Sequence, residues 1–202
     1  HYDLSMTYSQ AHDFAAAWQA IQETIGLQPF GSALTQKASL ALAWKGDVPA
    51  MRATLDQLAP ADRPEDRSVY YLMWCALIER QPGRVAAAAA LNARDYLEDS
   101  AYAGPKAWFP ALALQLAGQE NTARLQWQAA ERTLRERLRT DPQNSVYRMQ
   151  LATTLAWMGL TEEAARELAA VEAAWREQMN GFRARGLARY YAGTGDTAKA
   201  TA

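Results

Sequence analysis

The chain has few of the residues from which disulfides and metal sites are built. It holds one cysteine, Cys75, so no disulfide can form within it. Cys75 stands in an apolar stretch, and we expect a buried, unreactive thiol. Only two histidines are present, His1 and His12, and neither His-x-x-x-His nor Cys-x-x-Cys spacing occurs. The sequence therefore predicts no zinc site, and we expect no metal and no cofactor.

An excess of one charge and a long apolar run are also absent. The 21 lysines and arginines are balanced by 22 acidic residues. This argues against nucleic acid as a partner, because nucleic-acid binding needs a net basic face. No apolar stretch reaches the ~20 residues that span a bilayer, and the first residues lack the layout of a signal peptide. We expect no direct membrane span, while the 50% of apolar residues is enough for a buried core.

Catalytic constellations are missing as well. A Ser–His–Asp or Cys–His arrangement would have to use His12 as its base, and no phosphate-binding Gly-x-x-x-x-Gly-Lys loop occurs. Gly193 and Gly195 are assigned to a turn. The neighbouring carboxylates Glu162 and Glu163 fit the solvated first turn of a helix. The sequence therefore predicts a protein that is not an enzyme.

The chain does contain helix-breaking turns at regular intervals. Six short helix-breaking turns recur at steps of 34 to 41 residues. They lie at residues 12–13, 46–47, 82–83, 118–119, 159–160 and 195–196. An apolar helical stretch stands before each turn, and an Ala-rich one follows it. Self-similarity at this period is typical of stacked helix hairpins, so we predict an all-α fold.

The fifth repeat shows the hairpin most clearly. Its first helix, residues 145–158, carries one apolar stripe at spacings of three and four, formed by Tyr147, Leu151, Leu155 and Met158. Gly159 can take the left-handed conformation that ends a helix, and Thr161 is expected to cap the next helix. The second helix carries a stripe of its own, formed by Ala164, Leu168, Val171 and Trp175.

This order of residue types resembles the tetratricopeptide repeat (TPR): a large residue, Leu-Ala, an aromatic or Leu, Gly, and then Ala and a bulky residue. The fourth repeat matches through Gly118, Ala123 and Trp127, whereas the third matches least well. The resemblance implies an α-solenoid, a right-handed superhelix of five to six TPR-like hairpins in a single array. The approximate repeats are residues 1–30, 31–63, 66–100, 103–141, 143–179 and a partial 180–202. We expect this array to be a fragment of a longer protein.

Residues 105–167 are also similar to the C-terminal TPR region of bacterial multidomain signalling and regulatory proteins. The matching positions are Ala123-Arg124, residues 130–138, Pro142, Leu151-Ala152, Met158-Gly159 and Glu163-Ala164. In such proteins the repeats follow a protein kinase, an adenylate cyclase or a winged-helix domain, and none of these is present in this chain. The resemblance leaves the compartment open between bacterial cytoplasm and periplasm, depending on what the parent protein carries.

Departures from the repeat predict local structure. The fourth repeat needs a long second helix, residues 122–139, which accounts for the 41-residue step. The polar residues 61–68 predict a longer loop. Pro110 is tolerated if its helix begins near Trp108, since proline fits the first turn of a helix.

The long helix contains a locally basic run, residues 131–139. Glu131 and Arg135 are four residues apart, as are Arg132 and Glu136, so both pairs can form ion pairs along the helix. Two interpretations stay open. The run is a solvated helical face, or it is a contact for acidic lipid headgroups, nucleic acid or an acidic partner.

The resemblance also implies a binding surface, because the first helices of stacked TPR hairpins line the concave side. The predicted groove residues are Gln36, Leu40, Trp44, Tyr70, Met73, Leu77, Trp108, Leu112, Gln115, Met149, Thr153, Trp157, Arg185 and Arg189. Aromatic and methionine side chains with two arginines at one end suit an apolar peptide that carries an acidic group. The other tryptophans are expected to pack between helices: Trp18, Trp74, Trp127 and Trp175.

We therefore expect a non-catalytic module that binds a protein or peptide in this groove. Two alternatives stay open: a ligand-sensing regulatory domain of a multidomain signalling protein, and a scaffold for cell-envelope or secretion assembly. Self-association competes with peptide binding, since a truncated end repeat exposes an apolar stripe. Phe182, Leu187 and Tyr191 are the residues through which two copies are expected to meet.

Overall fold

The computed structural model describes residues 1–174 and 180–201, and side chains at residues 172–183 are outside its description. Within these ranges the chain forms twelve helices and one pair of short strands, so the predicted helical class is confirmed. The predictions for Trp175 and for the side chain of Phe182 lie outside the described residues. The helices fall into two compact units, His1–Ala103 and Gly104–Ala202.

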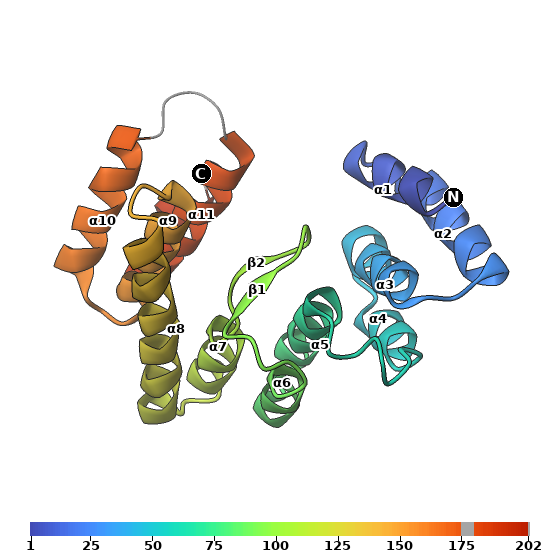
Figure 1. The fold of residues 1–202 in the computed structure, drawn as a ribbon, viewed down its shortest axis with the longest axis horizontal. Coiled ribbons are helices and arrows are strands. Elements are labelled where there is room, and N and C mark those ends of the chain that lie inside the picture. Colours follow the sequence, from blue (N-terminus) through green and yellow to red (C-terminus); the bar gives the residue numbers. More distant parts are fainter. Residues whose placement is uncertain (175–179, 202) are drawn as a thin grey trace. The chain divides into compact units, whose positions relative to one another are not determined.

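The N-terminal unit contains three helix hairpins, and its last residues enter a short pair of strands (Figure 1). Its helices are α1 (Tyr2–Gln10), α2 (Phe14–Leu27), α3 (Gly31–Lys45), α4 (Val48–Leu55), α5 (Asp66–Ile78) and α6 (Pro82–Ala89). The two helices of each hairpin pack on each other. The first helices also pack across hairpins, α1 on α3 and α3 on α5. Met51 and Leu55 of α4 fill the core beside α3 and are almost completely buried.

The C-terminal unit repeats this plan with three more hairpins. Its helices are α7 (Trp108–Leu116), α8 (Glu120–Thr140), α9 (Ser145–Trp157), α10 (Thr161–Ala174), α11 (Asn180–Thr194) and α12 (Thr197–Thr201). Helix α9 is central to this unit, because it packs against α8, α10 and α11. Residues 149–156 of α9 are all buried, as expected for a helix that is covered on every side.

A two-stranded hairpin, β1 (Tyr96–Glu98) and β2 (Ala103–Pro105), was not expected from the sequence. Tyr96 and Leu97 are buried, and Tyr102 stacks on Tyr70 of α5 with ring centroids 5.0 Å apart. These apolar contacts attach the hairpin to the third helix pair. The hairpin lies where the third predicted repeat gives way to the fourth.

Six turns join paired helices at or near the predicted positions, and one residue in each takes a left-handed backbone conformation. These residues are His12, Gly46, Arg80, Gly118, Gly159 and Gly195, with φ between 56° and 78°. The position of the third turn, residues 82–83, was wrong. Helix α5 ends at Ile78, Arg80 makes the turn, and Pro82 begins α6. Proline suits the first helical position, because the N–H that it lacks would have no helical partner there.

Aspartates follow the left-handed residue in three of the turns and cap the next helix. Asp13, Asp47 and Asp196 each accept a hydrogen bond from a backbone N–H three residues on, at 3.1, 2.9 and 3.1 Å. Such caps pair N–H groups that the first turn of a helix leaves open. Thr161, expected as a cap, is the first residue of α10 instead.

The local predictions drawn from proline and loop signals are confirmed. Pro110 lies in the first turn of α7, which begins at Trp108. The predicted long helix is α8, 21 residues from Glu120 to Thr140. The connection from α4 to α5 runs over residues 56–65 and contains most of the predicted polar loop.

Candidate functional site

Six of the predicted groove residues lie on α3 and α5 of the N-terminal unit, and most of them are buried there. Leu40 and Met73 have no exposed surface, and Gln36 and Leu77 are buried as well. Tyr70 is half-buried through its stacking on Tyr102. The sixth residue is Trp44, which keeps 40% of its surface exposed.

Trp44 belongs to an aromatic and cationic patch on α2 and α3. Its ring centroid lies 6.2 Å from that of Trp18. The Lys45 ammonium lies 4.4 Å from the Trp44 centroid and 5.2 Å from that of Trp18, and Lys37 lies 5.7 Å from the Trp18 centroid. The rings of Trp18 and Trp44 therefore both take part in cation–π contacts within the unit.

In the C-terminal unit, Trp108 connects the first helices of three hairpins. Its side chain is buried, and its indole N–H donates to the hydroxyl of Thr154 on α9 at 2.9 Å. The guanidinium of Arg189 on α11 lies 5.8 Å from its ring centroid. The predicted groove residues Trp108 and Arg189 are thus brought together, with the arginine exposed and the tryptophan beneath it.

A second cluster brings together Gln115 and Trp157, also predicted for the groove. Trp127 of α8 stacks on Trp157 with centroids 5.7 Å apart and planes 13° from parallel. The indole N–H of Trp127 donates to the side-chain oxygen of Gln115 at 3.2 Å. The prediction that Trp127 packs between helices is confirmed, and this packing also covers one face of Trp157.

The remaining groove residues of this unit differ in exposure. Met149 and Thr153 are buried in α9, Leu112 is half-buried, and Arg185 is exposed on α11 one turn before Arg189. Buried residues can support a surface, but only the exposed or half-buried ones can contact a ligand directly. Among the predicted self-association residues, Leu187 and Tyr191 are half-buried.

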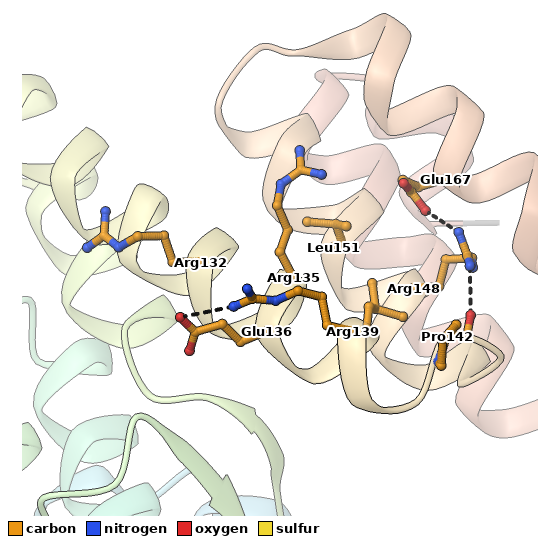
Figure 2. A pocket seen from close by; sticks show the side chains of 9 residues that line it. Arg132, Arg135, Glu136, Arg139, Pro142, Arg148, Leu151 and Glu167 are labelled. Atoms are coloured by element: carbon orange, nitrogen blue, oxygen red, sulfur yellow. Dashed lines mark hydrogen bonds and ion pairs between the residues drawn. The ribbon is translucent and has the colours of Figure 1, made fainter.

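An open hollow of about 560 Å³ lies on another part of the same unit (Figure 2). It is lined by residues of α8, α9 and α10 and by the α8–α9 connection: Arg132, Arg135, Glu136, Leu138, Arg139, Pro142, Arg148, Leu151 and Glu167. Four arginines thus face two glutamates over apolar side chains. None of these nine residues was predicted for the groove. The sequence indicated the hollow only through the basic run 131–139.

The arginines of α8 differ in how they are paired. Arg135 donates to Glu131 at 2.8 Å, as predicted, and also reaches Glu163 at 3.3 Å. The hydrogen bond to Glu131 raises the pKa of Arg135 above its ordinary value. The predicted pair of Arg132 with Glu136 does not form. Glu136 lies 3.6 Å from Arg139 instead, and Arg132 makes no hydrogen bond or ion pair within the described residues.

Arg148 enters the hollow from α9 and was missed by the sequence analysis. Its two terminal nitrogens donate to the Glu167 carboxylate and to the backbone carbonyl of Pro142, both at 2.8 Å (Figure 2). The two acceptors hold the guanidinium in place from different sides. No local pattern indicates this role, because Glu167 follows 19 residues later in the sequence.

A second polar network, in the N-terminal unit, has a structural role. Arg67 of α5 is only 8% exposed. It donates to Asp99 at 3.0 Å, to the Tyr2 hydroxyl at 2.8 Å and to the Ser100 hydroxyl at 2.5 Å. The network ties α1 and α5 to the turn of the β-hairpin and satisfies a buried charge that would otherwise be costly.

Signals for other kinds of site are weak in the part of the chain that the structure describes. It contains no group of histidine, cysteine and acidic residues that could hold a metal ion. None of its helices combines the length and apolarity needed to cross a membrane. Cys75 is buried, as predicted. Burial, and secondarily the charge of Glu79, raises the pKa of its thiol.

Comparison with known proteins gives no relative from which a function could be transferred. No family model, no curated protein and no solved structure matches this chain. The similarity to TPR proteins therefore stays a prediction from the residue pattern.

Proposed function

We propose that this chain is a non-catalytic interaction module that binds peptide segments of other proteins, and that its hairpins stack as a TPR-like α-solenoid. The observation that carries the proposal is the repeated hairpin. Six turns, each with one left-handed residue, are separated by 34 to 41 residues. Several successive first helices pack on each other: α1 on α3 and α3 on α5 in the N-terminal unit, and α9 on α11 in the C-terminal unit. This is the packing expected of stacked repeats.

The C-terminal unit offers the best-formed part of a peptide-binding face. Arg185 and Arg189 lie one helical turn apart on α11 and are exposed. The Trp108 ring centroid lies 5.8 Å from the Arg189 guanidinium. Half-buried Leu112 on α7 and Trp157 on α9 supply apolar surface. A peptide with one acidic group and apolar side chains matches this combination.

The proposal is tested by selecting peptides from a random display library on the immobilised chain. The selected peptides are then labelled and titrated by fluorescence anisotropy. We expect an acidic and apolar peptide family whose affinity falls about tenfold or more in Arg185→Glu/Arg189→Glu, since hydrogen bonds to charged groups contribute ~1.5–3 kcal/mol each.

The matched control is Arg124→Glu/Arg166→Glu, which makes the same charge change at exposed arginines of α8 and α10. This variant should bind the selected peptides normally. The proposal fails if no peptide family is selected, or if both variants weaken binding equally.

A further inference from the structure

We infer that the arginine-lined hollow on α8, α9 and α10 is a second binding site, which takes an acidic peptide segment through Arg132 and Arg139. The inference rests on the proposed function in so far as the ligand is a peptide. It uses none of the residues predicted for the groove.

Helix α8 presents three arginines to the hollow. Arg132, Arg135 and Arg139 follow one another at spacings of three and four residues and all line the hollow, so their positions form a row along one side of the helix. Successive members are separated by about one turn, ~5.4 Å along the axis. Carboxylates on alternate residues of an extended peptide repeat at ~6.6 Å. An acidic strand can therefore follow the row with its side chains close to successive guanidinium groups.

The arginines at the two ends of the row have N–H donors that a ligand can use. Arg132 has no hydrogen-bond or ion-pair partner within the described residues. The side chain of Arg139 is 76% exposed, and its contact with Glu136 is the longest of the ion pairs around the hollow. Arg135, between them, is held by two carboxylates. A ligand would meet two available guanidinium groups and one that is already neutralised.

The position of Arg132 is not explained by the end of its helix. Basic residues stabilise the last turn of a helix, where the backbone carbonyls carry partial negative charge. This accounts for Arg139 and for Arg137, which donates to the Tyr147 hydroxyl at 2.9 Å. Arg132 lies two turns earlier, beyond the reach of that effect.

On the wall formed by α9, a fourth arginine is already held in place. Arg148 is 29% exposed and fixed by Glu167 and the Pro142 carbonyl. A guanidinium has five N–H donors, so these two bonds leave others for a ligand. Because the group is already ordered, little side-chain entropy would be lost on binding.

The chemistry of the lining favours a peptide over nucleic acid. Leu138, Leu151 and Pro142 supply apolar surface, on which apolar side chains between the acidic ones can pack. Glu136 and Glu167 would repel a continuous phosphate backbone, whereas a peptide can place neutral residues beside them. The net charge of −1 gives the chain no general attraction for polyanions.

The test is a fluorescence anisotropy titration of the whole chain with a labelled peptide in which glutamate alternates with leucine. The matched peptide carries glutamine in place of glutamate. We expect only the glutamate peptide to bind, with an affinity that weakens as salt is raised. In Arg132→Glu/Arg139→Glu the affinity should fall about tenfold or more, while Arg124→Glu/Arg166→Glu should bind normally. Circular dichroism checks that both variants fold.

The outcomes separate this inference from the proposed function. If Arg185→Glu/Arg189→Glu loses binding while Arg132→Glu/Arg139→Glu is unaffected, the peptide binds at the proposed peptide-binding face and the inference about the hollow is wrong. If the glutamate peptide does not bind, or if Arg132→Glu/Arg139→Glu and its control lose affinity equally, the hollow is not a binding site. The peptide-display test of the proposed function is independent of that result. Binding of a single-stranded oligonucleotide through Arg132 and Arg139, but not of the peptide, overturns the choice of ligand.

Discussion

At the scale of single residues, the turns determine where each hairpin folds back. Four of the six left-handed positions are glycines, while His12 and Arg80 carry a side chain in the same conformation. A side chain costs roughly 1–2 kcal/mol in this region, because its Cβ crowds the following carbonyl. The turns therefore allow two opposite changes to be compared: a side chain added at a left-handed glycine, and a side chain removed at a left-handed arginine.

Gly159→Ala should lower the free energy of unfolding by about 1 kcal/mol. A Cβ at Gly159 would have no atom within 4 Å outside its immediate neighbours, so the cost is backbone strain alone. Arg80→Gly should raise the free energy of unfolding by a few tenths to about 1 kcal/mol, since relief of strain exceeds the entropy that glycine adds to the unfolded chain. Urea denaturation measures both changes. Destabilisation by both substitutions would contradict the left-handed assignment of Arg80.

Residue patterns could place side chains on helices but could not choose their partners. The resemblance to TPR hairpins implied that Trp108 and Trp157 lie on first helices, and they are found on α7 and α9. Their contacts with Thr154 and Trp127 join residues 46 and 30 positions apart in the sequence, and no local pattern carries that information. For the same reason the pairing of Arg135 was predicted, whereas the anchoring of Arg148 was not.

At the scale of elements, the packing of α11 on α9 depends on two small residues. A Cβ at Gly186 would lie 2.7 Å from the Met149 Cγ atom, and one at Gly193 would lie 2.9 Å from the Trp157 Cδ1 atom. Gly193 had been assigned to a turn, but it lies inside α11. Its role there is close approach between helices.

Gly193→Ala should therefore lower the free energy of unfolding by about 1–3 kcal/mol, as overpacked cores do. The backbone nitrogen of Trp157 would lie 3.1 Å from the new Cβ, so a side-chain rotation alone cannot relieve the crowding. The control is Gly26→Ala in α2, where a Cβ meets nothing within 4 Å and alanine favours the helix. Thermal unfolding followed by circular dichroism compares them, and equal effects would rule out a packing role for Gly193.

Helices were more predictable than the strands. The hairpins follow from apolar spacing, glycines and caps, all of which act within a few residues. The β-hairpin has only two short strands, and its buried Tyr96, Leu97 and Tyr102 gain their stability from packing rather than from a repeated local pattern. The third turn was misplaced because Pro82 and Gly83 resemble a turn, while the residue in the left-handed conformation is an arginine.

At the scale of the whole molecule, the proposed function draws on two compact units. Each unit has its own core and its own hairpins, and the same turn geometry recurs in both. We propose that these hairpins continue as one stacked array through the chain. Stacked arrays are elongated, because each repeat contacts only its neighbours.

Small-angle X-ray scattering of the monomer, separated by size exclusion immediately before exposure, tests this claim most directly. A compact globule of this length has a radius of gyration of about 17 Å. If the proposed array forms, we expect a clearly larger value, with a pair-distance distribution that has a long tail. A radius near 17 Å with a symmetric, bell-shaped distribution would contradict it.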